Sequence, residues 1–326
     1  MKRRLRILAA LAIVAAIAAG MVWYWRYSSL HPSTQDAYLQ ANVLDIAAQV
    51  TGTVAAVEVA EHQHVAAGDV LFRIDDRDYR LAVRQAQASV AEIAARQASY
   101  DSQTQAAEAA VSSARTAKET ADAALERAKR LFADGTVSQA SLDQATSAAA
   151  QAASTLQGAL AQLAQAQAAQ AANRAALAAA QAALEIARLN LERTVVRAPA
   201  AGWVANVELV KGAVVTAYAP LFALVESGAW WITANFKETD LARLRPGQPA
   251  TITVDMLPGV TLSGKVQSIG PGSGSTFSLL PPENASGNWV KVTQRFPVRI
   301  ALDAVRDDFR VGASSTVTVD TTAAGQ

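Results

Sequence analysis

Two stretches of the chain repeat each other at a constant offset of 150 residues, and this repeat restricts the fold more than any other feature. Residues 49–74 read QVTGTVAAVEVAEHQHVAAGDVLFRI, and residues 199–224 read PAAGWVANVELVKGAVVTAYAPLFAL. Both stretches contain short alternating apolar segments, a pattern typical of β-strands. We expect turns at the glycines of the two stretches, which are Gly52, Gly68, Gly202 and Gly212.

Each stretch is too small to bury a core by itself. We therefore expect the two to pair into one compact β-sandwich, because an apolar sheet face has to be covered by another element. The offset of 150 residues then places a long insertion between the two halves of a single domain.

The insertion has the sequence of an antiparallel coiled coil. Residues 79–133 and 139–193 contain no proline and a single glycine, Gly158, while alanine and glutamine, both good helix formers, are abundant. The second arm has a heptad seam that alternates large and small residues: Leu142, Ala145, Ala149, Ala152, Leu156, Ala159, Leu163, Ala166, Gln170, Asn173, Leu177, Ala180, Leu184, Ala187 and Leu191.

The first arm fits the same register with more polar interruptions. Its seam is Val83, Ala86, Val90, Ile93, Gln97, Tyr100, Thr104, Ala107, Val111, Ala114, Lys118, Ala121, Leu125 and Ala128. Each arm would be roughly 80 Å long. Two other interpretations are a disordered low-complexity tract and a coiled coil that only dimerises. The leucine heptad disfavours the first, and two equal arms around one breaker disfavour the second.

The breaker between the arms is residues 133–138. Gly135 suits the position just after a helix end. Either Ser138 or Ser141 can cap the helix that follows, and Ser141 begins a capping-box sequence that ends at Gln144.

The region after residue 229 again has the pattern of β-strands. We expect a small closed barrel over residues 229–322, with strands at 230–236, 250–255, 260–269, 289–301 and 315–319 and a short helix at 239–244. Two similar segments, Arg245-Pro-Gly247 and Arg310-Val-Gly312, precede strands of similar sequence. Residues 270–288 are rich in Gly, Ser and Pro and predict a long loop.

The N-terminus predicts a membrane anchor within residues 1–28. Ile7–Trp25 is an uncharged stretch of 19 residues, long enough to cross a bilayer as a helix. Four basic residues precede it, which keeps the N-terminus in the cytoplasm and exports the rest: Lys2, Arg3, Arg4 and Arg6. The alternative is a cleaved signal peptide. The aromatic cluster at residues 23–27 favours a retained anchor.

No convincing catalytic set is present, and we expect no enzymatic activity, no metal and no cofactor. The net charge of +1 argues against a nucleic-acid binder, and the absence of cysteine excludes disulfides and thiolate chemistry. His62 and His64 could bind a metal together, but without a third ligand a solvated turn is favoured. Asp75, Asp76 and Asp78 precede the first arm and are explained as helix-capping residues.

The split domain resembles that of the HlyD family of membrane fusion proteins, in which an α-helical hairpin interrupts a biotinyl/lipoyl-like domain. Residues 287–300 and 34–38 closely resemble the EmrA-type branch of this family. The resemblance implies an α+β fold with four parts: a transmembrane helix, a split lipoyl-like β-sandwich (38–78 and 194–226), an α-helical hairpin (79–193) and a β-barrel (229–322).

The turn of the hairpin is similar to that of the channel-docking adaptors in the family, which have an Arg-x3-Leu-x6-Ser/Thr pattern. Arg127, Leu131 and Ser138 stand at this spacing. The resemblance implies that these residues contact the periplasmic mouth of a TolC-like channel. The alternative is that Leu131 packs the turn, Ser138 caps a helix and Arg127 is solvated.

The resemblance implies a periplasmic adaptor of a bacterial efflux system, anchored in the inner membrane by one span. Its partners would be an inner-membrane exporter, typically of the major facilitator superfamily, a TolC-like outer-membrane channel and further copies of itself, as a trimer or hexamer. Two alternatives stay open: a membrane-tethered coiled coil without a role in export, and a carrier subunit with lipoyl or biotin on Lys211.

Overall fold

The computed structural model describes residues 17–274, 276 and 292–322. The chain forms two compact units. One comprises Met1–Ala48, Ala56–Phe72 and Val196–Gln326, and the other comprises Gln49–Ala55 and Arg73–Val195.

Much of the predicted membrane span Ile7–Trp25 lies outside the described residues, because these begin at residue 17. Residues 17–30 are helical. Within the described ranges, no helix combines the length and the apolar character needed to cross a bilayer. The transmembrane anchor therefore stays a prediction.

The repeat of the sequence is also a repeat of the structure. β2 (Gly52–Val57), β3 (His64–Val65) and β4 (Val70–Ile74) begin 150 residues before β6 (Gly202–Ala205), β7 (Val214–Val215) and β8 (Pro220–Lys237). β3 pairs with β6, so that His64 lies opposite Trp203. With β5 (Val195–Arg197), the remaining strands form a sheet of order β5-β4-β2-β7. The predicted pairing of the two stretches is confirmed.

The four glycines of the repeat have two different roles. Gly68 and Gly212 lie in turns with a φ of 90°, as predicted. The turns expected at Gly52 and Gly202 are wrong, since these residues begin β2 and β6. Close contacts explain the glycines there. A Cβ on Gly202 would overlap the carbonyl oxygen of Val225, and one on Gly52 would lie 2.5 Å from Cγ2 of Ile74.

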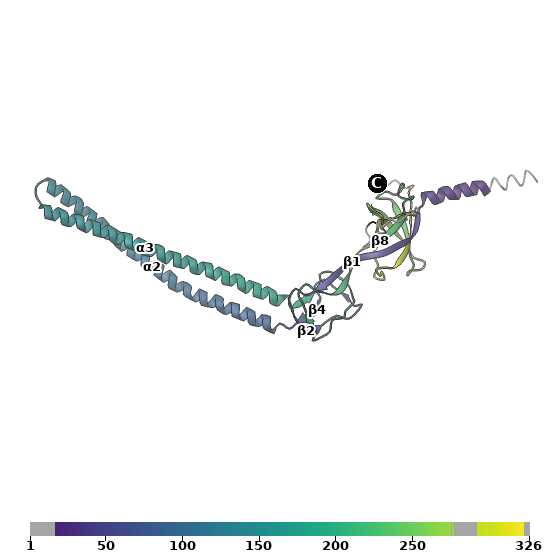
Figure 1. Ribbon diagram of the computed structural model, residues 1–326, viewed down its shortest axis with the longest axis horizontal. Helices are drawn as coiled ribbons and strands as arrows, with labels where there is room; N and C mark the ends of the chain where they lie inside the picture. The colour runs from purple at the N-terminus through teal and green to yellow at the C-terminus, as the bar shows by residue number, and fades with distance from the viewer. Residues whose placement is uncertain (1–16, 275, 277–291, 323–326) are drawn as a thin grey trace, which may run out of the picture. The chain divides into compact units, whose positions relative to one another are not determined.

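The insertion is an antiparallel helical hairpin, as predicted. α2 (Arg77–Ala133) and α3 (Gln139–Glu192) lie side by side in Figure 1. Every seam position predicted in either arm is buried or half-buried. Near the middle of the hairpin, Val111, Ala114 and Ala159 form an apolar cluster, against which Leu156 and Leu163 pack.

A polar layer interrupts this apolar seam. Nδ2 of Asn173 donates to Oε1 of Gln97 at 2.8 Å, and Nε2 of Gln170 donates to Oδ1 of Asp101 at 2.6 Å. Gln97 also donates to Asp101, at 2.7 Å. The bonds from Gln170 and Gln97 hold the pKa of the Asp101 carboxyl below its usual value. Polar seam layers of this kind fix the register of two helices.

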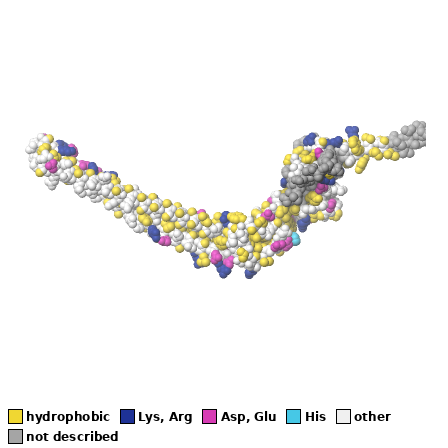
Figure 2. Space-filling model, viewed as in Figure 1, with side chains coloured by type: hydrophobic (Ala, Val, Ile, Leu, Met, Phe, Trp, Pro, Cys, Tyr) yellow, Lys and Arg dark blue, Asp and Glu magenta, His cyan; other side chains and the backbone are white. Residues whose placement is uncertain are grey.

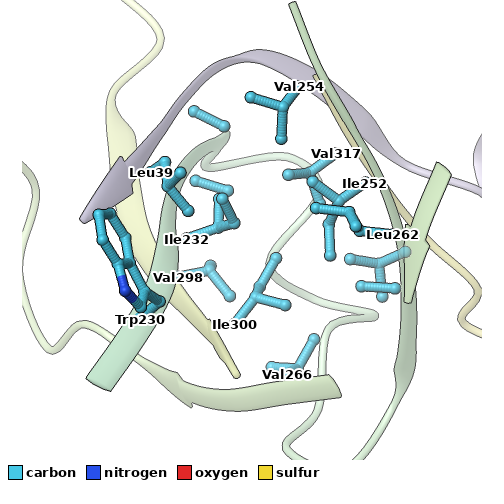
Figure 3. Close-up of a cluster of buried hydrophobic side chains, with 14 of the residues drawn as sticks. Leu39, Trp230, Ile232, Ile252, Val254, Leu262, Val266, Val298, Ile300 and Val317 are labelled. Atoms are coloured by element: carbon cyan, nitrogen blue, oxygen red, sulfur yellow. The ribbon is translucent and has the colours of Figure 1, made fainter. Parts of the chain in front are cut away.

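The barrel consists of β1 (Ser33–Ala47), β12 (Ser314–Val319), β9 (Pro249–Val254), β10 (Thr261–Ile269), β11 (Arg295–Leu302) and β8, in that order. β1 also pairs with β8, which closes the barrel. Apolar side chains from all six strands fill its interior (Figure 3). They include Leu39, Ile232, Ile252, Val266, Ile300 and Val317.

Two features of the barrel differ from the expectation, and a third lies largely outside the described residues. β1 was not expected to be a barrel strand, although it supplies the buried Ala37 and Leu39. Residues 239–244 form consecutive turns, such as Arg243 N–H to Asp240 O at 3.2 Å, in place of a helix. Pro246 follows closely and disfavours helical backbone before it. The loop at 270–288 and the first residues of the strand at 289–301 lie largely outside the described residues.

Candidate functional site

The candidate site is the hairpin tip, by which we mean residues 127–141. α2 ends there in a Schellman motif. The N–H of Thr136 donates to the carbonyl of Leu131 at 2.9 Å, and the N–H of Gly135 donates to the carbonyl of Phe132 at 3.0 Å. Gly135 has a φ of 71°, which a glycine adopts without strain. Oγ1 of Thr136 also donates to the carbonyl of Leu131, at 2.8 Å. The turn is thus well defined by its own hydrogen bonds.

Ser138 caps the second helix of the tip. It has extended backbone angles, and its Oγ accepts from the N–H of Ser141 at 3.3 Å and lies 3.1 Å from Oγ of Ser141. The alternative in which Ser141 is the cap is wrong, because α3 begins at Gln139 and Ser141 lies within its first turn. Ser138 remains exposed, so that its cap role leaves the side chain accessible.

Arg127 and Leu131 lie one turn apart on the same face of α2. Arg127 is exposed, and 45% of the Leu131 surface is accessible. Leu131 is therefore partly covered and partly accessible to a partner. The tip carries all three residues of the predicted docking pattern on its surface. Their contact with a channel stays a prediction.

Phe132 is a tip residue that the sequence analysis missed. Its surface is 38% exposed. It stands seven residues after Leu125, at the next seam position of the first arm. α2 ends at the next residue, Ala133. Extending the heptad spacing one position past the last assigned seam residue identifies an apolar side chain at the tip such as Phe132.

The tip is basic on its α2 side. Lys129 pairs with Glu126 at 2.9 Å, while Arg130 lies in the last turn of the helix. Figure 2 shows dark blue side chains gathered near the end of the hairpin. Basic groups at a helix C-terminus are favoured by the helix dipole. The tip therefore offers cations, two exposed apolar side chains and a hydroxyl to a partner.

The two histidines that could bind a metal together make different contacts. Nε2 of His62 lies 3.3 Å from the Glu61 carboxylate, whereas the His64 ring packs edge-on against Trp203 at 4.8 Å. In the ranges that the structure describes, no three His, Cys, Asp or Glu side chains are grouped to hold a metal ion. Lys211 is exposed in the turn before β7.

The acidic cluster at the start of α2 forms ion pairs. Asp75 accepts from the guanidinium and the N–H of Arg77, and these bonds lower the pKa of Asp75 from 3.8 to about 2. Asp76 occupies the N-cap position without a side-chain cap bond, and it pairs with Arg80 at 2.5 Å. The bond from the backbone N–H of Arg77 gives Asp75 part of the predicted capping role. Asp76 instead forms an ion pair with Arg80.

Known proteins resemble the chain over nearly its whole length. Residues 42–227 match the family described as "RND MFP, barrel-sandwich hybrid domain", and residues 229–322 match "AAEA-like beta-barrel domain". The multidrug resistance protein MdtN of Escherichia coli K12 is 37% identical, over 96% of this chain and 95% of MdtN. The multidrug export protein EmrA of the same strain is 35% identical, over 94% of this chain and 80% of EmrA.

A solved structure with the same fold is that of MacA from Actinobacillus actinomycetemcomitans. It aligns with a TM-score of 0.57 at 19% identity and covers 88% of this chain and 78% of MacA. The matched domains and the relatives agree with the interrupted sandwich, the hairpin and the barrel described above. The chain therefore belongs to the HlyD family of membrane fusion proteins, in the branch that includes EmrA, and is an adaptor protein of efflux systems.

Proposed function

We propose that the chain is the periplasmic adaptor of a tripartite efflux system, which links an inner-membrane exporter of the major facilitator type to a TolC-like outer-membrane channel. The observation that carries the proposal is the hairpin of roughly 80 Å, whose exposed tip carries Arg127, Leu131 and Ser138 at the spacing of the docking adaptors. The relatives EmrA and MdtN are named a multidrug export protein and a multidrug resistance protein, which supports a role in export.

Docking in this proposal is a modest polar interface. Arg127 supplies hydrogen-bond donors that suit carboxylate or carbonyl oxygens, Leu131 supplies an apolar contact, and Ser138 supplies a hydroxyl. Because Gly135 and Thr136 fix the turn, little conformational entropy is lost on binding. Export would be powered by the partner exporter, and the adaptor would carry out no chemistry and bind no nucleic acid.

The inner membrane is the proposed site of attachment. Ile7–Trp25 would cross the bilayer once, with Lys2 and Arg3 on the cytoplasmic side and the rest of the chain in the periplasm. The barrel forms hydrogen bonds with the C-terminal end of the helix at residues 17–30. Oγ1 of Thr321 donates to the carbonyl of Leu30 at 2.7 Å, and Arg243 donates to the carbonyl of Ser29.

Several copies, a trimer or a hexamer, would act together, since one thin hairpin cannot enclose a path for a solute. Chemical cross-linking of the full chain in membranes, followed by mass measurement of the linked species, counts the copies. A strictly monomeric adaptor in the presence of its exporter would overturn this part of the proposal.

The test of docking is a triple variant, R127A/L131A/S138A, measured for drug resistance in cells and for cross-linking to the channel. The matched control is R115A/L160A/S102A, which changes the same residue types at exposed positions away from the tip. We expect the tip variant to lose resistance and channel cross-links while circular dichroism shows normal helix content. Full resistance in the tip variant would refute docking through these residues.

Two further measurements separate the proposal from its alternatives. A tethered coiled coil without a role in export would show no exporter in pull-downs and would tolerate the tip variant. A carrier subunit would show the added mass of lipoyl or biotin on Lys211 in an intact-mass spectrum. We expect co-purification of an exporter and an unmodified Lys211.

A further inference from the structure

A cavity of about 380 Å³ lies in the unit that contains the barrel. Its walls come from β6, from β8 and from residues 309–311, which precede β12. The lining residues on which the argument depends are Trp203, Val225, Trp230, Phe309 and Arg310, with His62 at the edge. The volume falls within the range of pockets that bind small drug-sized molecules, roughly 300–1,000 Å³.

The walls of the cavity are aromatic and held in place. Trp230 and Phe309 pack edge to face with their ring centroids 5.5 Å apart, and both are almost fully buried. Nε1 of Trp230 donates to the carbonyl of Ser227 at 3.0 Å, so the polar atom of the indole is satisfied and its ring faces the cavity as an apolar surface. Walls fixed in this way are preorganised, which reduces the entropic cost of binding an apolar ligand.

One cation borders these walls. The guanidinium carbon of Arg310 lies 5.1 Å from the ring centroid of Trp203. Nη1 of Arg310 donates to the carbonyls of Asp307 and Phe309, which are neutral acceptors. Among the described residues, no carboxylate lies within ion-pair distance of Arg310. No described carboxylate therefore blocks a direct ion pair between Arg310 and a bound anion.

The nearby carboxylates are already engaged. Asp308 pairs with Arg306 at 2.8 Å, and this pair lowers the pKa of Asp308. Glu61 accepts from the N–H groups of Asn206 and Val207 at 2.9 and 2.7 Å, and these bonds lower its pKa as well. The charge of Arg310 also contributes to lowering the pKa of Asp308, although the two side chains form no direct ion pair. The cavity thus combines an aromatic interior with one cation that no described carboxylate contacts directly.

We propose that this cavity binds an amphipathic organic anion of small-drug size. Its apolar body would lie between Trp203, Trp230 and Phe309, and its carboxylate or sulfonate would pair with Arg310. A guanidinium suits such groups because it donates two parallel hydrogen bonds. The proposal does not depend on docking at the hairpin tip, since the two sites share no residue.

The test uses the full chain in detergent micelles, titrated by calorimetry with two probes of the same shape. Naphthalene-2-sulfonate carries a charge and naphthalene-2-sulfonamide is neutral. Heats from micelles without protein are subtracted. We expect saturable binding of one sulfonate per chain and at least tenfold weaker binding of the sulfonamide.

Two variants and a control locate the binding. R310Q is expected to weaken sulfonate binding about tenfold and to leave sulfonamide binding unchanged. V311W fills the cavity edge and is expected to abolish both. K265Q removes an exposed cation of β10 that does not line the cavity, and it is expected to change neither. Circular dichroism checks that each variant is folded.

Three outcomes would overturn the proposal. The first is the absence of saturable sulfonate binding. The second is binding to R310Q and V311W that equals binding to the wild type, which would place the probe elsewhere. The third is displacement of the probe by phosphatidylglycerol added to the micelles, which would make the cavity a lipid site.

Discussion

Gly68 and Tyr218 occupy equivalent positions in the two repeated stretches, and each bonds to the residue just before the opposite stretch. The N–H of Gly68 donates to the carbonyl of Ala198 at 2.8 Å, and the N–H of Tyr218 donates to the carbonyl of Ala48 at 2.7 Å. Both residues have a positive φ, 90° and 64°. The two halves are therefore tied by a reciprocal pair of hydrogen bonds that depends on two left-handed turns.

The first prediction concerns the backbone of these turns. Gly68→Ala should lower the free energy of unfolding by about 1–2 kcal/mol, because an alanine is strained at a φ of 90°. No heavy atom lies within 4 Å of the added Cβ, so contacts do not contribute. The control is Gly158→Ala in α3, where the site is equally open and alanine should raise stability by about 0.5–1 kcal/mol.

Tyr218→Gly completes this set of variants. Tyr218 is 72% exposed, so its removal loses little packing, and glycine adopts its φ of 64° without strain. We expect no loss of stability. Thermal melts followed by circular dichroism measure all three variants, and equal melting temperatures for Gly68→Ala and the wild type would contradict the argument.

The second prediction concerns the polar layer of the hairpin. Asn173 and Gln97 are joined by a 2.8 Å bond, so the variants N173A, Q97A and the double variant should give a coupling energy of about 0.5–1.5 kcal/mol. Gln167 is exposed and off the seam. A second double-mutant cycle, with Q97A and Q167A, should therefore give no coupling energy. Equal coupling energies in the two cycles would mean that the Asn173–Gln97 hydrogen bond has no specific effect.

The third prediction separates the two roles of Ser138. Ser138→Ala removes the acceptor that caps α3 and should cost about 1 kcal/mol. Ser138→Asp keeps a capping oxygen and should restore stability. If the hydroxyl also contacts a channel, the Asp variant should have normal thermal stability and reduced drug resistance. Normal resistance in the Asp variant would reduce Ser138 to a capping residue.

The fourth prediction concerns acid stability at the base of the hairpin. The pKa of Asp75 is lowered to about 2 by Arg77, so the folded state binds its proton less readily than the unfolded state. Its contribution is present above pH 4 and is lost as the pH falls from about 4 towards 2. Melting temperatures of Asp75→Asn should therefore fall less steeply over this interval than those of the wild type. Parallel curves would contradict this.

The sequence predicted those parts of the fold whose signal is local or periodic. The heptad places Leu156 and Leu184 on the seam. The offset of 150 residues predicts that the two stretches pair, and in the structure the equivalent residues Phe72 and Phe222 pack with ring centroids 6.0 Å apart. It did not predict that Ser33–Ala47 closes the barrel. This strand pairs with residues roughly 170–290 positions away, and alternation alone does not identify such partners.

The sequence also predicted part of the candidate site at the hairpin tip. The spacing of Arg127, Leu131 and Ser138 was visible in the sequence, and residue type left Ser138 and Ser141 as the two candidate caps. The exposure of Phe132 was not visible, because it depends on where the partner helix begins. The cavity at Trp230 and Arg310 depends on three-dimensional proximity of β8 to a loop about 80 residues later, for which the chain carries no local signal.

The position of β1 beside β12 also has a consequence for biosynthesis. Ser33 lies opposite Thr318. β1 is the first barrel strand to be synthesised, and it cannot pair with β12 until this last strand has also been made. Non-local pairing of this kind slows folding and leaves strand edges open in the meantime. A premature stop codon that removes only residues 314–326 would leave β1 and β9 without the strand between them. A deletion confined to the C-terminal end of the chain thus disrupts the pairing of the first barrel strand.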